Sequence, residues 1–82
     1  MEIKAGNVVF SLAGHDKGRA MVVTRIDGES IFVADGKERK LEKPKRKNKK
    51  HVRPTHKAIE LAGLTDKRLR RTLTEIFERT EE

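Results

Sequence analysis

Three short runs rich in β-branched residues, separated by glycine-containing turns, dominate the first half of the chain. The runs are residues 7–13 (NVVFSLA), 20–26 (AMVVTRI) and 30–34 (SIFVA). In the first run Val8 and Phe10 alternate with Val9 and Ser11, which is the two-residue period of a strand. Apolar runs this short, bounded by turn residues, are typical of strands rather than helices, so the first half of the chain predicts β-structure.

The turns between these runs favour antiparallel pairing. Residues 14–18 (GHDKG) hold two glycines that can adopt a positive φ and an aspartate that can close an Asx turn. The Asp-Gly pair at residues 27–28 is a strong hairpin signal, and a second pair at residues 35–36 leads into a short fourth segment, residues 38–41. Four closely spaced strands predict a small meander that closes into a barrel, because closure removes the unpaired edges of an open sheet.

The last third of the chain changes to a helical period. Residues 55–63 form a predicted first helix, which Gly63 would end in a left-handed conformation. Its apolar stripe consists of Ala58, Ile59, Leu61 and Ala62. Thr65 is a good N-cap for a second helix, in which Leu69, Leu73 and Phe77 share one face. We therefore predict two short helices joined at Gly63.

The positive charge of the protein is concentrated in one segment. Residues 43–53 (KPKRKNKKHVR) hold seven cations and no acid, and residues 37–57 carry eleven Lys and Arg against two Asp and Glu. The sequences on either side are each net −1, so this segment accounts for the whole net charge of +7. Such a field indicates a polyanion partner, first of all a nucleic acid, because neutralising phosphates releases counterions. We divide the single domain into residues 1–42, a basic connector at residues 43–54 and a helical segment at residues 55–82.

The candidate phosphate-binding residues lie in the basic segment and around the first turn. Lys17 and Arg19 would project outward from this turn, and the cations after residue 36 would extend the same positive strip. Asn48 and His51 could reach base edges or ribose. The alternatives are a solvated linker or nuclear-localisation signal for the segment, and a purely structural role for the turn. The full set of RNA-binding candidates is Lys17, Arg19, Lys37, Arg39, Lys40, Lys43, Lys45, Arg46, Lys47, Asn48, Lys49, Lys50, His51 and Arg53.

The scarcity of aromatic residues favours a folded RNA over a single strand. The chain has no Tyr or Trp, and its three Phe residues all fit apolar-face positions. Proteins that bind single strands stack bases on exposed aromatic side chains, whereas structured RNA is recognised through shape and backbone contacts. Reading the major groove of DNA with Arg68 and Arg71 is disfavoured by Glu75 and Glu78 on the same helix.

Enzyme activity, cofactors and metals find no support in the residues. His15, His51 and His56 are dispersed, no Cys is present, and neither a phosphate-binding loop nor a nucleophile elbow occurs. No apolar run approaches the ~20 residues that span a bilayer. The first residues also lack the charged-then-apolar layout of a signal peptide. We therefore expect a soluble, cytoplasmic, monomeric protein that is not an enzyme.

Most of the sequence resembles a known family. Residues 6–23 (GNVVFSLAGHDKGRAMVV) look like a KOW motif, in which a strand, a Gly/Lys-Gly turn and a second strand belong to the SH3-like barrel of ribosomal proteins and NusG-type elongation factors. Residues 34–40 (ADGKERK) and 44–51 (PKRKNKKH) narrow the match, together with the segment at residues 65–77. They are similar to small bacterial KOW-domain RNA-binding proteins related to the fourteen-e large-subunit ribosomal protein of archaea and eukaryotes.

The resemblance implies a mainly β fold with C-terminal α-structure: a small SH3-like (KOW) β-barrel, then the basic connector and the two short helices. It implies non-catalytic binding to RNA, with ribosomal RNA and the ribosome or a large-subunit precursor as partners. The KOW turn would comprise Gly14, His15, Asp16, Lys17 and Gly18. Two other function classes stay open, an interaction module of the transcription machinery and a non-specific DNA-binding protein.

Overall fold

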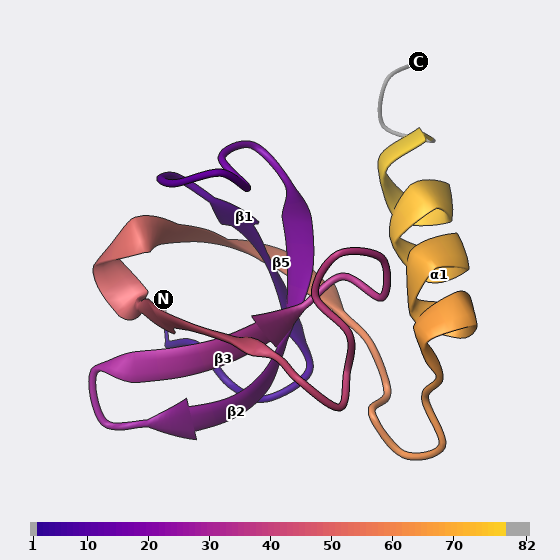
Figure 1. The fold of residues 1–82 in the computed structure, drawn as a ribbon, viewed down its shortest axis with the longest axis horizontal. Helices are drawn as coiled ribbons and strands as arrows, with labels where there is room; N and C mark the ends of the chain where they lie inside the picture. The colour runs from indigo at the N-terminus through magenta and orange to yellow at the C-terminus, as the bar shows by residue number, and fades with distance from the viewer. Residues whose placement is uncertain (1, 79–82) are drawn as a thin grey trace.

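The chain folds into a five-stranded antiparallel sheet with one C-terminal helix, as the computed structural model, which describes residues 2–78, shows (Figure 1). The strands are β1 (Asn7–Ser11), β2 (Ala20–Asp27), β3 (Ser30–Ala34), β4 (Lys45–Asn48) and β5 (Val52–Ala58). A single turn of 3-10 helix, η1 (Lys49–His51), joins the last two strands, and the helix is α1 (Asp66–Glu78). The coarse prediction of a mainly β fold with C-terminal α-structure is confirmed.

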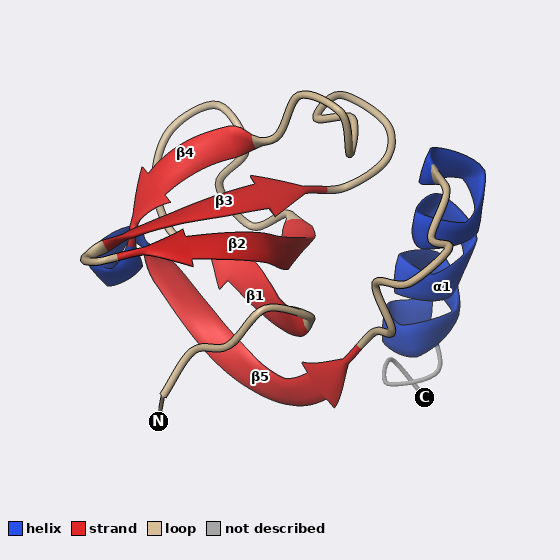
Figure 2. Cartoon of the chain, turned by 90° about the horizontal axis from the view of Figure 1, so that it is seen from below, coloured by secondary structure: helices blue, strands red, loops and turns tan. Residues whose placement is uncertain are grey.

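The sheet is curved, and its strand order is β4-β3-β2-β1-β5. Figure 2 shows β4 at one edge and β5 at the other, with the sheet bending between them. The two edge strands are consecutive in the sequence and are separated only by η1. The basic segment therefore runs from one edge of the sheet to the other.

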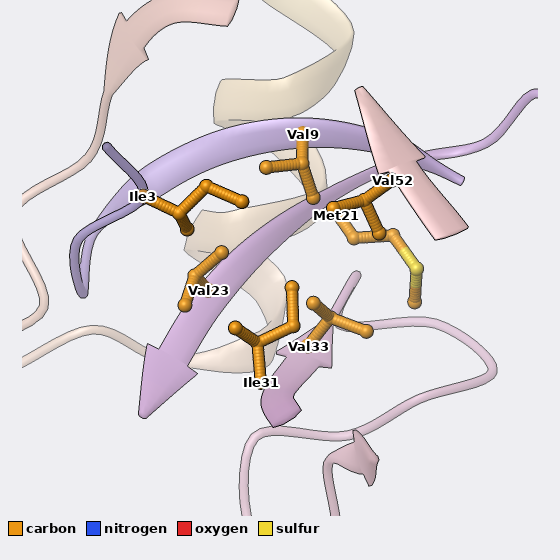
Figure 3. Packing of buried hydrophobic residues seen from close by; sticks show 7 residues of the cluster. All are labelled: Ile3, Val9, Met21, Val23, Ile31, Val33 and Val52. Carbon is orange, nitrogen blue, oxygen red and sulfur yellow. The ribbon is translucent and has the colours of Figure 1, made fainter. Parts of the chain in front are cut away.

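Both faces of the central strands are buried, because alternate residues enter two different cores. The inner core lies on the concave side of the sheet (Figure 3) and consists of Ile3, Val9, Met21, Val23, Ile31, Val33 and Val52. The opposite side presents Val8, Val22 and Ala34 to Leu69 and Leu73 of α1. The predicted strands β1, β2 and β3 and the predicted alternation along β1 are confirmed.

The predicted fourth strand at residues 38–41 is wrong. The Asp35 carboxylate accepts hydrogen bonds from the backbone N–H groups of Lys37 and Arg39, both at 2.9 Å, and the Arg39 carbonyl accepts from residues 35 and 36. These local bonds fold residues 35–39 into a tight loop that cannot join a ladder. The fourth strand is β4 instead, and it pairs with β3 through Ile31 opposite Lys47.

The predicted first helix at residues 55–63 is also wrong, since this segment contains most of β5 and an irregular connection. β5 pairs with β1, with Phe10 opposite Arg53, and the Thr55 hydroxyl donates to the Val8 carbonyl at 2.7 Å. The unpaired edge of β1 takes these hydrogen bonds, and this long-range pairing outweighs the local helical pattern. Ile59 and Leu61 of the expected stripe still pack against the α1 side of the sheet.

The basic connector predicted at residues 43–54 contains β4, η1 and the start of β5, so most of it has regular secondary structure. The second helix is confirmed as α1, with Thr65 as its N-cap: the Thr65 hydroxyl accepts from the Arg68 N–H at 3.2 Å. Leu64, just before the cap, and Leu69 pack in one cluster, as the two residues of a hydrophobic staple do. Residues 79–82 of the predicted helical segment lie outside the described residues.

Candidate nucleic-acid interface

The turn between β1 and β2 lies directly against η1. The Leu12 N–H donates to the His51 carbonyl at 2.8 Å, which continues the pairing of β1 with β5 past the end of the strands. Gly14 and Gly18 both have φ of 85°, a conformation that the turn requires and that other residues rarely adopt. The two surfaces that the sequence singled out, the turn and the basic segment, are thus neighbours.

A buried ion pair ties this turn to β4. The Lys47 ammonium lies 3.1 Å from Asp16 Oδ1 and donates to the Ala13 carbonyl at 3.2 Å, and both side chains are less than a tenth exposed. Strand alternation explains the burial, because Lys47 is opposite the core residue Ile31. The prediction that Lys47 binds phosphate is therefore corrected: its ammonium is held inside the protein.

Asp16 is placed by side chains more than by its own turn. Its Oδ1 also accepts a hydrogen bond from the Ser11 hydroxyl at 2.9 Å, while Oδ2 is buried without a hydrogen-bond partner among the described residues. Burial raises the pKa of the Asp16 carboxyl, but the Ser11 hydrogen bond and Lys47 lower it by more, so this pKa lies below its ordinary value. Asp16 stays charged at neutral pH and keeps Lys47 in place.

The other residues of the basic segment are accessible, although several have structural partners. Lys43, Arg46, Lys50, His51 and Arg53 are exposed, and Lys45 and Lys49 are half-buried. Arg46 donates to the Ser30 hydroxyl at 3.1 Å. Asn48, predicted to contact RNA, caps η1 by accepting the Lys50 N–H at 2.8 Å. The Arg53 guanidinium lies 5.4 Å from the centre of the Phe10 ring. The accessible cations of the segment therefore lie on both sides of the buried Lys47 along the sequence.

Arg19 is engaged in ion pairs on the other side of the turn. Its guanidinium contacts Asp35 at 2.9 Å and Glu38 at 3.1 Å. The hydrogen bond to Asp35 raises the pKa of Arg19 further above its ordinary value. For Asp35, burial raises the carboxyl pKa, but the Arg39 and Lys37 backbone N–H groups and Arg19 lower it by more. Arg19 thus holds the loop at residues 35–39, while Lys17 is exposed and has no ion pair in residues 2–78.

The loop at residues 35–41 is fixed to the first turn of α1. The Leu41 N–H donates to the Asp66 carboxylate at 2.7 Å, and the Arg70 guanidinium donates to the Gly36 carbonyl at 3.0 Å. Of the candidates in this loop, Lys37 and Lys40 are exposed and Arg39 is half-buried. This arrangement brings the predicted cation Lys37 beside α1.

A groove of about 1120 Å³ runs between α1 and the β1–β2 side of the sheet. We call it the helix groove. Its lining includes the cations Lys37, Lys67, Arg70 and Arg71 and the apolar side chains Phe10, Ala20, Leu73 and Phe77. Lys67 and Arg70 were not among the residues predicted from the sequence, although the spacing of residues 67, 70, 71 and 74 is that of one helical face.

Acidic side chains limit the positive surface at one point. The Lys49 N–H donates to the Glu29 carbonyl at 2.9 Å, so η1 adjoins the β2–β3 turn with its exposed Asp27 and Glu29. Within residues 2–78, no group of three His, Cys, Asp or Glu side chains could hold a metal ion. In the same residues, no helix has the length and apolar character to cross a membrane.

No protein-family model matches this chain, and no curated protein has a significantly similar sequence.

Proposed function

We propose that the protein is a non-catalytic RNA-binding module that docks on structured ribosomal RNA, as a ribosome-associated factor or a ribosomal-protein-like component. One observation carries the proposal. The Leu12–His51 hydrogen bond and the Lys47–Asp16 pair hold the β1–β2 turn against η1, so Lys17, Lys49 and Lys50 belong to adjoining segments. Cations fixed in this way meet a phosphate backbone without first ordering a free chain, which reduces the entropic cost of binding.

We further propose that the sheet is an SH3-like barrel, as the KOW resemblance implies. In a flat sheet, β4 and β5 would lie four strand spacings apart, roughly 19 Å. Asn48 and Val52 are joined by four residue steps, which span about 14 Å at most. The connection through η1 therefore favours a sheet that rolls its edges toward each other.

The chemistry of the surface favours RNA phosphates over protein partners. Lys43, Arg46, Lys50 and Arg53 are exposed and belong to no ion pair among residues 2–78. Each such cation that neutralises a phosphate releases counterions and adds affinity whatever the base sequence. With six contacts, affinity should fall roughly 10³-fold between 50 and 200 mM salt.

Charge reversal tests the proposal. Lys49→Glu/Lys50→Glu should abolish binding to ribosomal RNA and co-sedimentation with ribosomes at physiological salt. Lys4→Glu/Lys57→Glu is the matched control, because it changes the net charge equally at exposed positions near the opposite end of β1 and β5, where Asn7 pairs with Ala58. This control should bind almost normally.

Ribonuclease treatment separates RNA docking from docking on a protein. If RNA carries the interaction, ribonuclease should release the protein from its partners. Recovery of the same partners after ribonuclease, or normal ribosome association of Lys49→Glu/Lys50→Glu, would contradict the proposal and favour a protein-interaction module.

A further inference from the structure

We infer that the helix groove holds an unpaired nucleotide of the bound RNA, with its base on the apolar floor of the groove and its phosphate on cations of α1. This inference rests on the proposed function and extends it, because it adds a second contact site outside the basic segment. In Figure 1, α1 lies to one side of the sheet. The groove is lined by residues of α1 and by Gly18, Arg19 and Ala20 around the start of β2.

The floor of the groove suits a flat apolar ring. Phe10 comes from β1 and Phe77 from α1, and their rings meet edge to face with centroids 4.7 Å apart. Ala20 and Leu73 complete the apolar lining. Both rings are half-buried, and an unpaired base of RNA would stack on the part of them that stays accessible. The volume of about 1120 Å³ is slightly above the ~300–1,000 Å³ of typical ligand sites, so the open groove has room for a nucleotide.

The rim of the groove suits an anion. Lys37 projects from the loop, and Lys67 and Arg71 from α1, and none of the three forms an ion pair within the described residues. Arg19 and Arg70 also line the groove, but Asp35 and the Gly36 carbonyl engage them. Two acids line the groove, Asp35 and Glu75. Asp35 is paired with Arg19, whereas Glu75 has no ion pair in the described part of the chain. The net field of the groove is positive.

The position of the groove favours RNA over an acidic protein segment. Gly18 and Arg19, at the end of the β1–β2 turn, line it directly. Arg53 of the basic segment lies over Phe10, one of the floor residues. The groove is therefore continuous with the proposed phosphate-binding surface, and a nucleotide released from a duplex on that surface would enter it next.

The test compares two hairpin RNAs, one fully paired and one with a bulge of unpaired nucleotides, in a binding assay with the full chain. The wild-type protein should bind the bulged hairpin about tenfold more tightly, as expected for one stacked base. Arg71→Glu should remove this preference. Arg68→Glu is the matched control, since Arg68 is exposed on α1 but lines a different pocket, and it should keep the preference. Circular dichroism checks that both variants are folded.

Each result decides between the claims. Equal affinity of the wild-type protein for both hairpins would overturn the groove assignment and leave the proposed function intact. A preference lost equally in Arg71→Glu and Arg68→Glu would place the unpaired nucleotide elsewhere. Binding of neither hairpin would overturn both claims. A poly-glutamate peptide that binds the wild-type protein but not Arg71→Glu, without any bulge preference, would assign the groove to an acidic protein segment.

Discussion

At the scale of single residues, the buried pair of Lys47 and Asp16 connects the two segments that carry the proposed function. Asp16 lies in the β1–β2 turn and Lys47 in β4, and their contact of 3.1 Å crosses from one to the other. Lys47 was predicted from the sequence to bind RNA. Its charge instead holds the β1–β2 turn against β4 and so positions the cations around it. The exposed cations around it remain available for phosphates.

Removing one member of this pair should cost more than removing both. Lys47→Met leaves the Asp16 carboxylate buried without its counterion and should lower the free energy of unfolding by roughly 3–5 kcal/mol. Asp16→Asn added to Lys47→Met removes the stranded charge and should recover part of this loss. Urea denaturation of both single variants and the double variant measures the coupling. Additive losses would contradict a direct interaction between the two side chains.

The acid limb of the stability curve should depend on Asp16 and Asp35. Both carboxyls have a pKa lowered below the ordinary value of 3.8 in the folded protein. The unfolded chain therefore binds more protons between the folded and unfolded pKa values, and stability rises with pH across that window. Their contribution should be complete above about pH 5 and should be lost as the pH falls below about 4.

Urea midpoints at a series of pH values check this dependence. Asp35→Asn should be less stable than the wild-type protein at neutral pH, and the difference should shrink in acid. The opposite trend, a difference that grows as the pH falls, would show that the folded-state pKa of Asp35 is raised.

At the scale of elements, the sequence predicts those whose signals are local. β1, β2, β3 and α1 follow from alternation, Asp-Gly turns and the Thr65 cap. β4 and the basic half of β5 lack that signal because their residues are nearly all polar, and they become strands by pairing with β3 and β1. The helix groove could not be predicted either, since it combines side chains from β1, β2, a loop and α1.

The contact between the loop at residues 35–41 and α1 should be sensitive to Gly36. A Cβ at this position would collide with the Asp66 carbonyl oxygen, and φ is 80°. Gly28 has a φ of 64°, and a Cβ there would meet no atom within 4 Å, so it is the matched control. Both Gly→Ala changes carry the left-handed penalty of ~1–2 kcal/mol. Gly36→Ala should lose a further ~1–3 kcal/mol from overpacking.

Thermal and urea unfolding of the two alanine variants measure the difference. A Gly36→Ala protein as stable as Gly28→Ala would mean that the loop moves away from α1 at little cost. In that case Lys37 would not be held beside the helix groove.

At the scale of the whole molecule, the position of a charge matters more than the net charge. The molecule extends 32 × 28 × 24 Å, whereas the Debye length at physiological salt is about 8 Å. A side chain at the far end of the sheet therefore has little effect on a phosphate bound near η1. The net charge of +7 alone does not determine the affinity for RNA.

Glu29 provides the corresponding gain-of-affinity prediction. Its carbonyl accepts the Lys49 N–H at 2.9 Å, so the Glu29 backbone adjoins η1, and its exposed carboxylate should repel an RNA docked there. Glu29→Gln should strengthen RNA binding severalfold at low salt. The gain should fade toward 1 M salt, where the Debye length is only ~3 Å. Glu60→Gln changes the net charge equally in an exposed residue next to Ile59, whose N–H bonds to Gly6 at the other end of β1, and should have little effect. Equal gains from both variants would mean that RNA senses the net charge of the protein rather than the surface around η1.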